Sequence, residues 1–170
     1  AARWTGLGAT LLIVVGLAAC APEPAPSPTP TGFASEQEAF AAAEATYRAY
    51  VDALNQVDLS DPATFEPVFD LTAGDARDSI SKELSRMHAE GWNVNGDTQI
   101  TTLKLADSQD GTVSLSVCAD VSGVSLEDAS GNSMVSTDRP PVQPLSIEVS
   151  NADGKLAITS IVGRDGAPSC

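Results

Sequence analysis

The chain has 170 residues and a net charge of −14 at pH 7, from 23 acidic and 9 basic side chains. No basic stripe is present to neutralise phosphates, so we expect neither a nucleic-acid partner nor docking onto anionic lipid headgroups. Hydrophobic residues make up 42% of the chain, which is enough for a packed core in a single domain of ordinary size.

The first segment is a short apolar stretch from Leu7 to Ala19, followed by Cys20. Its 13 residues would cover about 20 Å as a helix, against about 30 Å of bilayer hydrocarbon. The stretch is therefore too short to span a membrane, but it has the length of the apolar region of a cleaved export signal.

The end of this stretch, Leu17-Ala18-Ala19-Cys20, resembles the lipobox of bacterial lipoprotein precursors. The resemblance implies cleavage after residues 1–19 and a diacylglyceryl group on the thiol of Cys20. Acyl chains would then anchor the protein to the outer face of the cytoplasmic membrane, because two chains hold a protein where one does so only marginally. The alternative is an ordinary secretory signal that is cut elsewhere.

Residues 20–32 contain a proline at every second position from Pro22 to Pro30. This spacing favours extended polyproline II and prevents a helix or a sheet. The stretch is interpreted as a tether that lifts a domain off the bilayer; a proline-rich recognition motif is the alternative. Residues 33–170 then form one domain.

Three helices are predicted at the start of this domain, over residues 35–56, just after residue 61, and over 73–90. Each has a local signal: a capping box with an apolar face, an N-cap residue before a proline, and a terminal glycine. In the sequence these are Ser35 with Glu38, Asp61-Pro62, and Gly91.

From residue 99 onward the apolar residues recur with the period of a strand. Strands are predicted over 99–106, 112–121, 123–127, 142–150 and 155–163, with 134–137 returning from a turn at 128–132. Asn151-Ala152-Asp153-Gly154 predicts a tight hairpin, 107–111 a longer turn, and Pro140, Pro141 and Pro144 a break in pairing. Helices followed by an antiparallel sheet of four to six strands give an α+β class, with the first helix across the concave face.

Cys118 and Cys170 are the cysteines that remain besides Cys20. An even pair in an exported chain is typical of a disulfide. Closing a loop of about fifty residues would stabilise the fold by roughly 4 kcal/mol in the chain-entropy model. A redox or metal role would need a nearby partner such as Cys-x-x-Cys, and the sequence has none. We therefore predict no metal and no cofactor.

The chain resembles actinobacterial lipoproteins whose exported domain is a nuclear transport factor 2-like, or cystatin-like, α+β roll. The residues that carry this resemblance are the lipobox, the tether, Ala45-Thr46-Tyr47-Arg48-Ala49-Tyr50, Val117-Cys118-Ala119-Asp120-Val121, and the closing hairpin near Cys170. The fold hosts ketosteroid isomerases, polyketide cyclases, transport factors and binding domains, so it implies no single activity.

A non-catalytic binding or scaffold domain is the function predicted, for a small apolar ligand or a cell-envelope protein. The residues expected nearest its pocket are Tyr47, Tyr50, Phe65, Phe69 and Trp92. An isomerase- or cyclase-like enzyme is the alternative, which needs a carboxylate or histidine beside a tyrosine in an open pocket; the candidates are Asp52, His88 and Asp120. A third interpretation is a homodimer through the sheet.

Overall fold

The computed structural model describes residues 33–170. The predicted signal peptide, Cys20 and the tether lie outside the described residues. The helices are α1 (Glu36–Leu54), the 3₁₀ helix η1 (Pro62–Phe65), α2 (Glu66–Asp70) and α3 (Gly74–Ala89). The strands are β1 (Asn93–Asn95), β2 (Gln99–Gln109), β3 (Thr112–Asp120), β4 (Ser125–Glu127), β5 (Val142–Ala152) and β6 (Lys155–Gly163).

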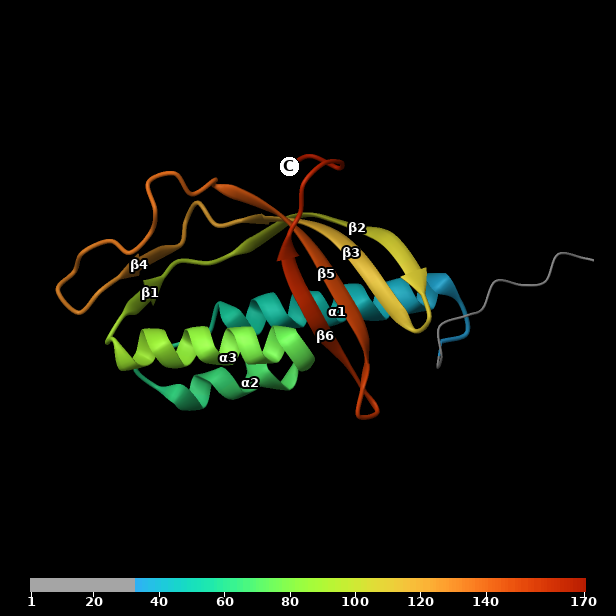
Figure 1. The fold of residues 1–170 in the computed structure, drawn as a ribbon, viewed down its shortest axis with the longest axis horizontal. Helices are drawn as coiled ribbons and strands as arrows, with labels where there is room; N and C mark the ends of the chain where they lie inside the picture. The colour runs from blue at the N-terminus through green and yellow to red at the C-terminus, as the bar shows by residue number, and fades with distance from the viewer. Residues whose placement is uncertain (1–32) are drawn as a thin grey trace, which may run out of the picture.

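The strands form two antiparallel sheets. The larger has the order β2-β3-β5-β6, and the smaller pairs β1 with β4. Figure 1 shows the β1–β4 pair continuing away from β2 and β3 as an arm, which lies over the end of α3. Helix α1 contacts all four strands of the larger sheet. The predicted α+β class, with the first helix across the sheet, is therefore confirmed.

The predicted helix signals act as local caps. The Ser35 hydroxyl accepts a hydrogen bond from the Glu38 N–H (3.2 Å), while the Glu38 carboxylate accepts one from the Ala34 N–H (2.9 Å). The capping box therefore closes one residue earlier than expected. Asp61 caps η1, and Gly91, with φ +69°, follows the end of α3. Helix starts and stops can be predicted because the groups involved lie within a few residues of one another.

Both hairpins of the larger sheet close through two-residue turns. Asp110-Gly111 has φ values of 51° and 80°, and Asp153-Gly154 has values of 53° and 83°. These conformations match the twist of the flanking strands. The prediction of a five-residue turn at 107–111 was wrong, because β2 continues to Gln109 opposite Thr112.

Three further strand predictions need correction. Pro144 does not interrupt pairing: it lies within β5 opposite Cys118, and proline is compatible with a strand where its missing N–H is not needed. Residues 134–137 form no strand; only a bridge between Glu127 and Ser133 forms there. Strand β1 was not predicted, because three residues held only by pairing with β4 show no alternation.

The core lies between α1, α3 and the inner face of the larger sheet. Its fully buried side chains come from helices and strands alike: Tyr47, Val68, Leu84, Val113, Leu115, Val117, Ile147, Val149 and Ile158. The alternating residues of β3 and β5 therefore face the helices, as the period of two requires.

Candidate functional site

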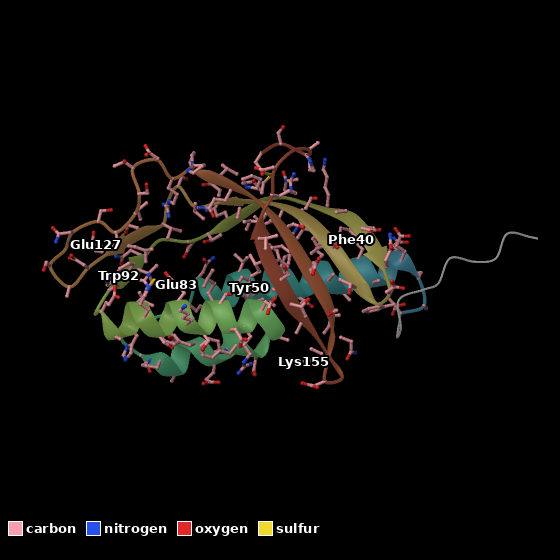
Figure 2. All side chains as sticks on the ribbon, viewed as in Figure 1. Phe40, Tyr50, Glu83, Trp92, Glu127 and Lys155 are labelled. Atoms are coloured by element: carbon pink, nitrogen blue, oxygen red, sulfur yellow. A yellow bond between two sulfur atoms is a disulfide. The ribbon has the colours of Figure 1, made fainter. Side chains whose placement is uncertain are left out.

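The five aromatic residues predicted near a pocket do not line one common cavity. Tyr47 and Phe65 are only 2% and 3% exposed and belong to the core. Phe69 packs edge-on against Phe65, with ring centroids 6.3 Å apart. Trp92 lies beside the end of α3, far from Tyr50 (Figure 2), and stacks under the Arg86 guanidinium at 4.5 Å. Of the five, Tyr50 faces an open groove.

The space between the helices and the β1–β4 arm is reduced to a small apolar slot. It has a volume of about 140 Å³ and is lined by Leu54, Asn55, Val57, Leu59, Leu84, Met87, Val94, Gly96, Thr98, Val124 and Leu126. The Asn55 amide exchanges two hydrogen bonds with the backbone of Thr98, of 3.0 and 2.9 Å. None of the described lining residues is charged, so the slot can take an apolar group but offers no acid or base.

A second hollow lies between α3 and the edge strand β6, and we call it the α3–β6 groove. Its volume is about 360 Å³, and its lining residues are Tyr50, Asp75, Ala76, Ser79, Ile80, Glu83, Ser160, Ile161, Val162. The Tyr50 side chain is buried, and this burial raises its pKa to about 12. Asp75 and Glu83 are exposed, and Glu83 is paired with Arg86 at 2.6 Å. The groove is therefore apolar inside with an acidic rim.

The three candidate catalytic groups lie apart from this groove. His88 is exposed, as expected for the end of α3, and its Nδ1 lies 2.7 Å from the carbonyl oxygen of Leu59. Asp52 is exposed on α1. The Asp120 carboxylate accepts a hydrogen bond from Ser122 N–H, and bonding to Ser122 lowers its pKa. These groups do not converge on one point, which acid–base catalysis would require.

The predicted disulfide is present. Cys118 and Cys170 are bonded, with their Cα atoms 5.7 Å apart. Cys118 alternates with the core-facing Val117, so the bond ties the C-terminal residue to the outer face of β3.

Among residues 33–170, no three His, Cys, Asp or Glu side chains lie close enough to hold a metal ion. No helix in that same range has the length and apolar character needed to cross a membrane.

Comparison with known proteins identifies the fold but no family. No family model matches the chain, and no curated protein matches it. Among solved structures, one described as a "putative aromatic ring hydroxylase" from Novosphingobium aromaticivorans is 12% identical, with a TM-score of 0.50, over 76% of this chain and 96% of that one. The intermembrane space region of the chloroplast protein ARC6 is 16% identical, with a TM-score of 0.51, over 74% and 97%.

The domain has the nuclear transport factor 2-like α+β roll that the sequence resemblance implied. At such low identity, these likenesses show the fold alone. A structure described as an enzyme and one described as a region of a chloroplast protein share it, so the fold does not choose between catalysis and binding. That choice depends on the residues of this chain.

Proposed function

We propose that this chain is a membrane-anchored extracytoplasmic lipoprotein whose domain, residues 33–170, binds a partner without catalysis. The observation that carries the proposal is the filled interior of the roll. Core side chains such as Tyr47, Leu84 and Leu115 are at most 2% exposed and belong to one hydrophobic cluster between the helices and the sheet.

Isomerase-type catalysis requires a base and a hydrogen-bond donor that converge on one carbonyl. The slot left beside the arm has a volume of about 140 Å³, whereas small-molecule pockets range over about 300–1,000 Å³. The amide of Asn55 in the slot already bonds to Thr98. The packed interior thus stabilises the domain, and the outer surfaces of the domain are left for binding a partner.

The leader supports the membrane anchor, and the charge of the chain argues against electrostatic attachment to lipid. An acidic protein of net charge −14 gains nothing from anionic headgroups, so its attachment would rest on acyl chains at Cys20. A Cys20→Ser variant should move from the membrane pellet to the soluble fraction. Mass spectrometry of the native N-terminus should find diacylglycerol on Cys20; an intact leader, or equal partitioning of the variant, would contradict the anchor.

Binding is tested by photo-crosslinking in intact cells. A benzophenone amino acid is placed at exposed positions over the whole domain, one position for each variant. We expect crosslinks to the same envelope protein from one contiguous surface. Crosslinks from scattered positions to many proteins, or none from any position, would contradict a binding domain.

An enzyme remains the second candidate because the α3–β6 groove brings Tyr50 and Asp75 to one hollow. Its test is deuterium exchange at the carbon beside the carbonyl of a small apolar ketone, followed by NMR. Exchange above the buffer rate that is lost in both Tyr50→Phe and Asp75→Asn would favour catalysis. We expect no such exchange, because Asp75 is exposed and water solvates its carboxylate.

A further inference from the structure

We propose that the α3–β6 groove binds an extended segment of a partner protein that carries alternate apolar side chains flanked by lysine or arginine. The segment would add to the larger sheet as a strand beside β6. This inference rests on the proposed binding function and names the surface and the kind of partner. Three features of the groove support it: a free strand edge, an apolar floor and an acidic rim.

The first half of the β6 edge is already covered. The Ala73 N–H donates to the Ile158 carbonyl (2.8 Å), and the Ile158 N–H donates to the Leu71 carbonyl (2.9 Å). The register then shifts beside Glu148, and the bulge changes which backbone groups face outward. Residues 71–73 therefore block strand addition at Ile158, and the part of β6 after the bulge stays open.

The second half of the β6 edge has backbone groups free to pair. The Arg164 N–H points toward β5 and donates to the Pro144 carbonyl at 2.9 Å. Because successive N–H groups of a strand point to opposite sides, those of Gly163 and Ile161 point away from β5. Within residues 33–170 no hydrogen bond to either residue is found outside the sheet. Exposed N–H and C=O groups of this kind accept an added strand.

The floor of the groove suits an apolar side chain. Tyr50 is buried beneath it, and Ile80 and Ile161 are half-buried at its sides. Val162 also lines the groove and is 54% exposed. A volume of about 360 Å³ lies within the range of specific ligand pockets.

The rim determines the charge of the partner. Asp75 and Glu83 line the groove, and no lysine or arginine is among its described lining residues. Of the nearby arginines of α3, Arg77 donates to the Phe69 carbonyl (2.7 Å), whereas Arg86 pairs with Glu83 of the rim and with Glu90. Within residues 33–170, Asp75 is therefore the rim carboxylate without a salt bridge, and it supplies most of the negative charge. A second copy of this chain would bring a second acidic rim to the same edge. Charge complementarity therefore favours a basic partner over self-association.

The test uses the full chain in nanodiscs of zwitterionic lipid and fluorescein-labelled nine-residue peptides. The first peptide alternates valine with threonine and lysine; the second has the same composition with its valines adjacent; the third has glutamate for lysine. Fluorescence polarisation should show the first binding at least about tenfold more tightly than either control. Equal binding by the scrambled peptide would mean unspecific attraction to an acidic protein, and would overturn the proposal.

Variants of the chain locate the binding. Asp75→Asn should weaken binding of the first peptide about two- to fivefold. The matched control is Asp78→Asn, because Asp78 is an exposed carboxylate of the same helix that does not line the groove. Gly163→Pro removes an outward N–H and should weaken binding about tenfold. Unchanged binding in both Asp75→Asn and Gly163→Pro would overturn the proposal.

Changes in the peptide keep the test independent of folding. N-methylation of one amide at a time should weaken binding at every second position, because only alternate N–H groups of an added strand face β6. A loss without that period, or self-association of the chain that Gly163→Pro abolishes, would overturn strand addition by a basic segment. If peptides fail while photo-crosslinks come from another surface, the binding function stands and the groove assignment fails.

Discussion

Gly96 lies where the β1–β4 arm leaves the larger sheet, and its replacement tests how the roll closes. Its φ is +83°, and a Cβ atom there would lie 2.8 Å from the carbonyl carbon of Gly123 and closer still to its oxygen. Both contacts are with backbone atoms, which cannot rotate away. Gly96→Ala should therefore force the two chains apart at the bend.

The expected cost adds two effects. An L-residue in the left-handed region costs about 1–2 kcal/mol, and overpacking a close contact costs about 1–3 kcal/mol. Gly96→Ala should thus lower the free energy of unfolding by about 2–5 kcal/mol.

Two other glycines separate these effects. At Gly91 (φ +69°) a Cβ would lie 3.5 Å from the Ala129 Cβ, an ordinary contact, so Gly91→Ala should lose only the conformational part. At Gly123, which lies outside the left-handed region, the nearest atom is 4.0 Å away. Gly123→Ala should therefore be neutral or slightly stabilising.

Urea unfolding followed by far-UV circular dichroism measures these differences. Hydrogen exchange of the Asn93 and Glu127 amides, which face each other across β1 and β4, would show whether the arm separates first. If Gly96→Ala fell within about 0.5 kcal/mol of Gly91→Ala, the close crossing of Gly96 and Gly123 would be refuted.

Three further predictions concern the stability of the domain. Replacing Cys118 and Cys170 together by alanine opens a loop with a sequence separation of 52. Urea unfolding should show that the free energy of unfolding falls by about 4 kcal/mol. A fall below about 1 kcal/mol would contradict the idea that the disulfide stabilises by constraining the unfolded chain. Leu115 is fully buried, so Leu115→Ala should cost about 2–5 kcal/mol by the same measurement, and a neutral result would contradict a filled roll. Hydrogen bonds from Asn132 lower the pKa of Asp128 below 3.8, so the stability this group contributes is present above about pH 4 and is lost as pH falls through its folded pKa. An acid titration should therefore destabilise the natural chain more than Asp128→Asn; identical titrations would contradict this role.

The parts of the fold that could be predicted are those with local causes. Ser35 and Asp61 cap the helices that come after them, and Asp153-Gly154 closes its hairpin, because each makes its contacts within a few residues. The bonding of Cys118 to Cys170 was predicted from an even count in a chain expected to be exported. Strand β1, residues 93–95, was not predicted, because it forms only through pairing with residues 125–127.

The candidate site was predicted least well. Aromatic residues indicated a pocket, yet whether a ring fills a core or lines a hollow depends on what packs against it. Tyr50 lines the α3–β6 groove together with Asp75 and Val162, which were not singled out. No local signal could have found them together, since the groove joins α3, residues 74–89, to β6, residues 155–163, which are far apart in the sequence.

Composition, period and capping residues were thus sufficient for the α+β class, the helix boundaries, the second hairpin and the cysteine pair. The first three properties depend on backbone conformation and on neighbours in the chain, whereas the cysteine pair was predicted from an even count. The filled interior, the bend at Gly96 and the open half of β6 were decided only when distant segments met. Packing and edge exposure are properties of the assembled surfaces, and no single segment of the chain contains them.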